Sequence, residues 1–184
     1  GNKLNAVTAE VNDHFAKFRI SDALMAVYKF FWDDFCAWYL ELVKPAYGSP
    51  IDAKTYEATL EFFEDLLKMI HPIMPFITEE LWHAVRERGE NETIMFERYP
   101  VAGESDAEYI AAFGLATEVV AGIRNIRQQK GLSPKEPLKA YFVGDFSKEM
   151  GPVVVKLANV SEIQHVTTID ESLAGVSFMA GAGM

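Results

Sequence analysis

Two prolines, Pro72 and Pro75, interrupt a helical pattern in the middle of the chain and constrain its fold more than any other feature. Each lacks a backbone N–H and disfavours helical geometry in the residue before it. Before them, apolar residues recur at three- and four-residue steps, in the order Tyr56, Leu60, Phe63, Leu67 and Ile70. Such spacing places them on one buried face of a helix. The sequence therefore predicts a helix that ends near His71 and another that begins at Pro75, a residue suited to the first helical position.

The same periodicity predicts three further helices, one starting near Leu4, one after Ser21 and one after Ser105. The expected helix caps, in chain order, are Ser21, Asp52, Gly89, the capping box of Ser105 with Glu108, and Gly131. Residues 93–100 are expected to form an extended crossover. A bundle of five helices follows from these patterns.

The second of these helices carries an aromatic face. Its apolar residues are Leu24, Val27, Tyr28, Phe31, Phe35, Trp38, Tyr39 and Leu42. At helical spacing a stripe of this kind more often packs in a core than stacks on bases. The single cysteine, Cys36, lies in the same run and is expected to be a buried thiol.

The pattern changes at Pro137. Residues 138–143 resemble a strand, Ser147 is placed to cap a short helix over 153–157, and residues 162–167 and 175–180 are two more strand candidates. The predicted fold is therefore mainly α. A helical bundle over residues 1–136 is followed by a small β-α-β-β unit over residues 137–184, which we expect to be truncated.

Three segments resemble a known family. The run His-Pro-Ile-Met-Pro-Phe-Ile-Thr-Glu-Glu-Leu-Trp at 71–82 is similar to the helical anticodon-binding domain of the class I aminoacyl-tRNA synthetases for large aliphatic amino acids. The run Phe-Cys-Ala-Trp-Tyr-Leu-Glu at 35–41, with Lys-Pro at 44–45, resembles the valine branch of that family. The helix end at 123–135, which runs into a Ser-Pro loop, is also similar. Together the resemblance covers residues 4–179.

This resemblance implies that the chain recognises the anticodon stem and loop of the valine tRNA. Its other partners would be the catalytic and editing domains of the same polypeptide, where ATP and Mg²⁺ serve an ATP-dependent ligase. A cytoplasmic protein that binds neither membrane nor DNA is expected. Two alternatives stay open, namely the isoleucine or leucine branch of the family, and a helical interaction module that binds no RNA.

The sequence contains no set of residues that indicates catalysis by this chain. The His-Ile-Gly-His and Lys-Met-Ser-Lys-Ser signatures of the synthetase family are missing, as are a glycine-rich phosphate loop and a nucleophile turn. The four histidines, His14, His71, His83 and His165, are isolated and do not have metal-ligand spacing. We therefore predict no catalytic residue, no metal site and no cofactor in the chain itself.

One local excess of positive charge stands against a net charge of −10. RNA binding depends on neutralising phosphates with Lys and Arg, so this excess is the best candidate RNA site. It comprises Arg124, Arg127, Lys130, Lys135 and Lys139, in a window that holds one acid, Glu136. Forked guanidinium groups suit phosphate contacts. An equally supported interpretation is a solvated helix end whose cations complement the helix dipole. A weaker second cluster comprises Lys17, Arg19 and Lys29.

Overall fold

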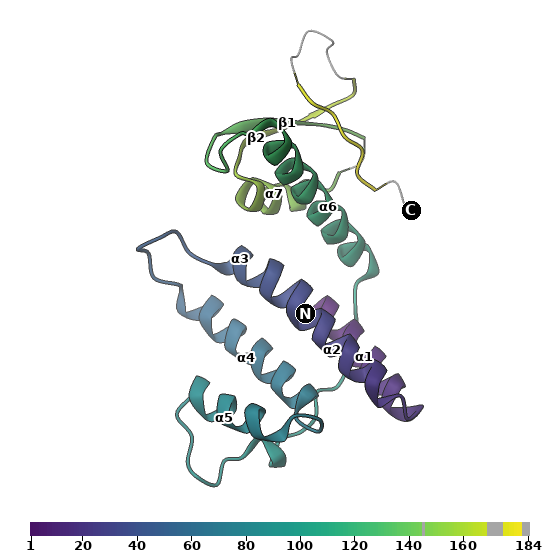
Figure 1. The fold of residues 1–184 in the computed structure, drawn as a ribbon, viewed down its shortest axis with the longest axis vertical. Helices are drawn as coiled ribbons and strands as arrows, with labels where there is room; N and C mark the ends of the chain where they lie inside the picture. The colour runs from purple at the N-terminus through teal and green to yellow at the C-terminus, as the bar shows by residue number, and fades with distance from the viewer. Residues whose placement is uncertain (145, 169–174, 182–184) are drawn as a thin grey trace. The chain divides into compact units, whose positions relative to one another are not determined.

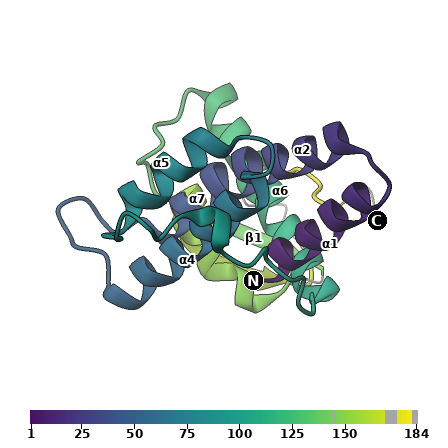
Figure 2. The same ribbon diagram turned by 90° about the horizontal axis from the view of Figure 1, so that it is seen from below.

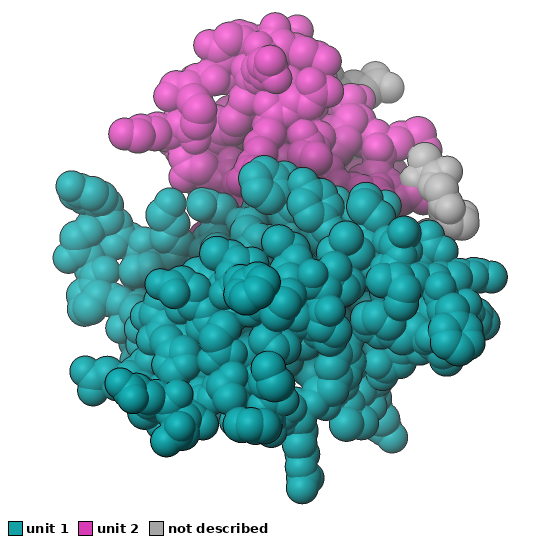
Figure 3. All heavy atoms as spheres, turned by 60° about the horizontal axis from the view of Figure 1, so that its bottom comes forward, with its two compact units in different colours: residues 1–105 teal, residues 106–184 magenta. Residues whose placement is uncertain are grey.

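The computed structural model describes residues 1–144, 146–168 and 175–181. The chain is mainly helical and divides into two compact units, Gly1–Ser105 (unit 1) and Asp106–Met184 (unit 2), which Figure 3 colours separately. The sequence placed a division at residue 136 instead. The two differ because the long helix that follows residue 106 packs against the helix of the small α/β part.

Unit 1 is a helical bundle (Figure 1). Its elements are α1 (Asn2–Ala16), α2 (Ile20–Lys29), the π-helical η1 (Phe30–Tyr39), α3 (Leu40–Val43), α4 (Ala53–Ile70), α5 (Pro75–Val85) and the 3₁₀ turn η2 (Ile94–Phe96). The segments α2, η1 and α3 follow one another without a break. The long helix that they form runs antiparallel to α1 and α4, and Figure 2 shows α1 and α2 side by side from below.

The predicted break at the prolines is confirmed. Asp52 caps α4 by accepting a hydrogen bond from the Thr55 backbone N–H at 2.9 Å, and Pro75 is the first residue of α5. Across the break, His71 Nδ1 and the hydroxyl of Thr78 are hydrogen-bonded at 2.7 Å. The side chain of His71 thus joins the end of α4 to the first turn of α5.

Three of the expected helix ends are wrong. Helix α2 begins at Ile20, so Ser21 lies inside its first turn rather than at its cap. Helix α6 (Ala107–Lys130) is capped by Asp106, whose carboxylate accepts from the Tyr109 N–H at 3.0 Å. Helix α5 ends at Val85, four residues before the expected Gly89. A cap forms where the backbone leaves the helix. The position of a helix end is less well determined by local sequence than the helix itself and can differ by a few residues.

The main core of unit 1 lies between α1, the α2–η1 stretch and α4. Its buried members are Val11, Ala23, Val27, Phe30, Phe35, Leu66 and Met69. A smaller cluster of Leu67, Trp82 and Ile94 joins α4 to α5 and η2. Two residues predicted to be core are exposed instead, Tyr28 on α2 and Tyr56 on α4. The apolar faces of α2 and α4 are wider than the surfaces that their neighbouring helices cover, so residues at the edges of these faces stay exposed.

Unit 2 is built on one long helix. Its elements are α6 (Ala107–Lys130), β1 (Leu138–Val143), the 3₁₀ turn η3 (Lys148–Met150), α7 (Gly151–Ala158) and β2 (Val160–Val166). β1 and β2 pair in parallel, with Ala140 opposite Ile163 and Phe142 opposite His165. The crossover helix α7 packs against α6 and β2, as a parallel strand connection requires.

Residues 175–180, the third predicted strand, form no strand. The described segment 175–181 lies along α6 instead, where the Gly181 N–H donates to the Glu118 carboxylate at 2.9 Å. The Phe178 ring rests on Gly122 so closely that a Cβ added there would overlap the ring. The segment is therefore held by a helix surface and not by a sheet edge. Within the described ranges, no helix is long and apolar enough to cross a membrane.

Candidate nucleic-acid interface

The five cations predicted to form an RNA site all belong to unit 2, at one end of α6. Arg124, Arg127 and Lys130 occupy successive turns of the helix, and Gly131 ends it in the left-handed conformation with a φ of 64°. A six-residue loop, 131–136, then leads towards β1 and carries Lys135. Lys139 follows as the second residue of β1. The local fold therefore groups the cations around one helix end.

Arg127 occupies a different position from the one the sequence predicted. It is only 4% exposed, and its guanidinium group points into unit 2. Nη1 donates to the carbonyls of Ser133 and Glu136 at 2.8 and 2.7 Å. Nη2 donates to the carbonyls of Ala158 and Asn159 at 3.3 and 2.9 Å. The forked group thus binds four backbone carbonyls, and these contacts occupy the nitrogens expected to face phosphate.

Arg124 is exposed and lies one turn earlier on α6. Its Nε and Nη2 atoms donate to the carbonyl of Leu157 at 3.2 and 2.8 Å. Together with Arg127 it therefore satisfies three carbonyls at the C-terminal end of α7 and the residue after it. Cations favour this end of a helix, because its unsatisfied carbonyls carry a partial negative charge.

The three lysines are exposed. In the part of the chain that the structure describes, no ion pair involves Lys130 or Lys135. Lys139 Nζ lies 3.1 Å from the carboxylate of Glu162 on β2, and this hydrogen bond raises the pKa of Lys139. Hydrogen bonds from Gln164 and Lys139 lower the pKa of Glu162. The ammonium groups of Lys130 and Lys135 are the most available cations of the set.

Sequence reasoning missed Asn159 and Glu162, which shape this site from a distant part of the chain. Asn159 follows α7 with a φ of 53°, and its side-chain amide donates to the Pro134 carbonyl at 2.8 Å. An asparagine just after an apolar helix is a known signal for a left-handed helix end. That signal could have identified the conformation of Asn159. Its contact with the loop depends on the fold.

Unit 1 carries the weaker cation cluster and two exposed aromatic rings. Lys17 is paired with Asp13 at 2.6 Å, one turn earlier on α1. Tyr28 and Trp32, the latter 60% exposed, lie four residues apart on the α2–η1 stretch with Lys29 between them. Exposed aromatic faces next to a cation can stack on unpaired bases.

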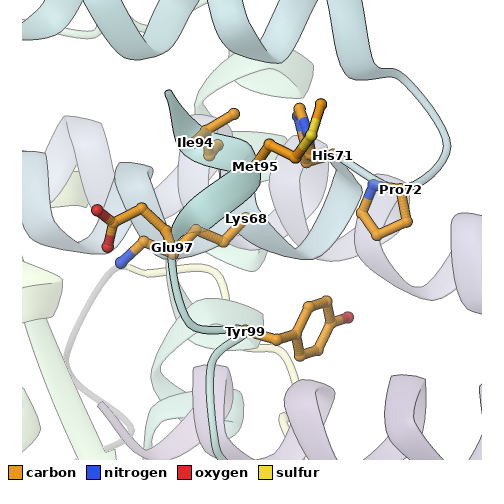
Figure 4. Close-up of a pocket in the computed structure, with 7 residues that line it drawn as sticks. All are labelled: Lys68, His71, Pro72, Ile94, Met95, Glu97 and Tyr99. Carbon is orange, nitrogen blue, oxygen red and sulfur yellow. The ribbon is translucent and has the colours of Figure 1, made fainter. Parts of the chain in front are cut away.

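A hollow of about 190 Å³ lies in unit 1 between α4, the proline break and η2 (Figure 4). Its lining consists of Lys68, His71, Pro72, Ile94, Met95, Glu97 and Tyr99. Burial raises the pKa of the Tyr99 hydroxyl to about 12. His71 is bonded to Thr78, and the Lys68 ammonium lies 5.5 Å from the centre of the Trp82 ring. His71 and Lys68 thus already contact other residues of unit 1, whereas the buried Tyr99 hydroxyl has no hydrogen-bond partner among the described residues.

The described residues contain no group of three or more His, Cys, Asp or Glu side chains that could hold a metal ion. Burial raises the pKa of the Cys36 thiol, which disfavours the reactive thiolate.

The chain resembles a known family and its members over most of its length. The family model described as the anticodon-binding domain of tRNA ligase matches residues 2–142. A valine–tRNA ligase of Parabacteroides distasonis is 48% identical over 178 residues, which are 96% of this chain and 20% of that protein. A valine–tRNA ligase of Porphyromonas gingivalis is 46% identical over 98% of this chain and 20% of that protein. A valine–tRNA ligase of Fusobacterium nucleatum is 36% identical over 91% of this chain and 20% of that protein. The chain spans about a fifth of the length of the curated relatives it matches.

Proposed function

The chain belongs to the family of anticodon-binding domains of tRNA ligases, and from this we propose that it recognises the anticodon stem and loop of the valine tRNA. The observation that carries the choice of tRNA is the identity of 44–48% to valine–tRNA ligases from several bacteria. In this proposal the chain positions the tRNA for aminoacylation by a catalytic domain of the same polypeptide, in the cytoplasm. ATP and Mg²⁺ would act in that domain.

The proposed phosphate contacts are Arg124, Lys130, Lys135 and Lys139. With a net charge of −10, the chain as a whole repels RNA, so binding must depend on a local basic surface. The end of α6 provides the densest group of exposed cations. Side chains cannot read the deep, narrow major groove of A-form RNA, so the anticodon bases would be read as unpaired bases. The exposed rings of Tyr28 and Trp32 are suited to stack on such bases.

A titration of the chain with three RNAs tests this proposal. The RNAs are the valine tRNA, the same tRNA with a changed anticodon, and the isoleucine tRNA. We expect the valine tRNA to bind best, and we expect its affinity to fall roughly a hundredfold between about 50 and 200 mM salt if four phosphates are neutralised. Equal binding of all three RNAs would contradict anticodon recognition. The absence of binding to any of them would favour an interaction module that does not use RNA.

The Glu162→Gln substitution is expected to strengthen binding of the valine tRNA about threefold, because it removes an anion beside a phosphate-contacting lysine. In the wild-type chain, Glu162 accepts a hydrogen bond from Lys139 and competes with the phosphate. The salt dependence of binding should become steeper, since Lys139 can then replace a counterion in full. Fluorescence anisotropy with labelled tRNA at several salt concentrations measures both effects.

The matched control is Glu108→Gln, which makes the same change of charge in the first turn of α6, at the far end of the helix from Lys130. We expect little change in affinity from this control. If both variants gain affinity equally, the effect comes from net charge, and Lys139 is not a contact.

A further inference from the structure

The loop 131–136 is held from the inside by a single buried side chain. The guanidinium group of Arg127 binds the loop carbonyls of Ser133 and Glu136 with one terminal nitrogen. The other terminal nitrogen binds Ala158 and Asn159, where α7 ends and the chain turns into β2. Arg127 thus ties the loop to the end of α7, across 31 and 32 residues of sequence.

Three further hydrogen bonds fix the same loop. The side-chain amide of Asn159 donates to the Pro134 carbonyl, and the Lys135 N–H donates to the Ser133 hydroxyl oxygen at 3.2 Å. The Leu132 N–H in turn donates to the Arg127 carbonyl at 2.9 Å. The loop is therefore held by hydrogen bonds within itself, to the end of α6 and to Asn159, whereas the side chains of Lys130 and Lys135 are exposed.

We propose that Arg127 is a positioning residue, which shapes the 131–136 loop so that Lys130 and Lys135 meet RNA phosphates, without touching the RNA itself. The inference rests on the proposed function, because it presumes that these lysines contact the tRNA. A loop that already has its bound conformation loses less conformational entropy on binding. Lysine cannot replace arginine here, because one ammonium group cannot reach carbonyls on two sides as the planar fork does.

The variants Arg127→Lys and Asn159→Gly test the inference with the 184-residue chain and the valine tRNA. Arg127→Lys keeps the charge but loses the fork. Asn159→Gly keeps the left-handed backbone, which glycine adopts readily, and removes only the hydrogen bond to Pro134. We expect Arg127→Lys to weaken binding about tenfold and Asn159→Gly about threefold, in the range that ordering a loop contributes to affinity. The slope of affinity against salt should stay unchanged, because the exposed lysines remain.

A double-mutant cycle separates positioning from the other roles that Arg127 could have. Arg127→Lys and Asn159→Gly are each also made in a chain that carries Lys130→Gln and Lys135→Gln. In that chain, measured at low salt, neither should change the affinity, since the loop then has no lysines to position. The two lysine changes alone should reduce the salt slope by about one for each lysine. Circular dichroism and the melting temperature show how much of each variant is folded.

Three outcomes would overturn the inference. If Arg127→Lys weakens binding equally with and without the lysines and also reduces the salt slope, Arg127 contacts the RNA directly. If Arg127→Lys and Asn159→Gly both lower the melting temperature but bind the tRNA as tightly as the wild type, the contacts of Arg127 and Asn159 with the loop serve stability alone. If the lysine variants change the slope while Asn159→Gly has no effect, the loop needs no positioning. If Arg127→Lys does not fold, the affinity of Asn159→Gly for the valine tRNA alone tests whether positioning of the loop contributes to binding. Failure of the wild type to bind any tRNA would instead refute the proposed function.

Discussion

Replacing Glu64 by alanine is expected to lower the free energy of unfolding of unit 1 by about 4 kcal/mol, because it leaves the partly buried Arg88 without its counterion and removes one of the two carboxylates that Arg86 binds. Glu64 lies on α4 and is 8% exposed. Its Oε1 atom accepts from Arg86 Nε at 2.6 Å and also from Arg88. Both arginines follow α5, so one carboxylate holds the chain that leaves that helix against α4.

The arginines have further partners that make the network cooperative. Arg86 also pairs with Glu57 at 2.6 Å, and the hydrogen bonds that Arg86 donates to Glu57 and Glu64 raise its pKa above the ordinary value. The guanidinium carbon of Arg88 lies 3.7 Å from the centre of the Trp82 ring. Loss of Glu64 would therefore also disturb the small cluster of Leu67, Trp82 and Ile94.

Urea unfolding followed by tryptophan fluorescence measures this effect. The three tryptophans, Trp32, Trp38 and Trp82, all lie in unit 1, so the signal reports that unit. Glu61→Gln on the same helix is the control, because Glu61 is exposed and should change stability by less than about 0.5 kcal/mol. A loss below about 1 kcal/mol for Glu64→Ala would mean that water replaces the carboxylate at little cost, and that the network is not effectively buried.

The second large effect is expected for Phe35→Ala, which should destabilise unit 1 by about 4 kcal/mol through a cavity in its aromatic core. Phe35 is 3% exposed and lies at the centre of a group of rings. The neighbouring rings, with centroid distances from Phe35, are Phe62 at 5.1 Å, Tyr39 at 5.5 Å, Phe31 at 5.8 Å and Phe63 at 6.0 Å. Aromatic pairs at such distances add to the free energy of burial.

The same unfolding assay measures Phe35→Ala, with Phe35→Leu and Phe76→Ala beside it. Phe35→Leu refills most of the volume and should lose less stability. Phe76 is 91% exposed, so the same truncation there should be nearly neutral. If Phe35→Ala and Phe76→Ala cost the same, the aromatic face of η1 is not the centre of the core, and the packing of α4 on this helix is looser than described.

Much of the fold follows from local patterns. The spacing of Leu60, Phe63 and Leu67 predicts α4, and the two prolines predict where it ends, because both depend on backbone geometry within a few residues. Asp52 as a cap and residues 138–143 as a strand are confirmed for the same reason. The exposure of Tyr28 and Tyr56 could not be predicted, since periodicity identifies a face but not the width that a neighbouring helix covers.

The sequence by itself determined the order of the helices, the break at Pro72 and Pro75, the strand β1 and the gathering of cations at the end of α6. Only the tertiary structure decided which of those cations face solvent. Arg124, Arg127 and Lys130 follow one another at three-residue steps in the sequence. The guanidinium group of Arg127 is nevertheless buried, because the end of α7 supplies carbonyls at positions 158 and 159. A helical repeat encodes the direction of a side chain, whereas the groups that it meets come from distant segments and exist only after the chain has folded.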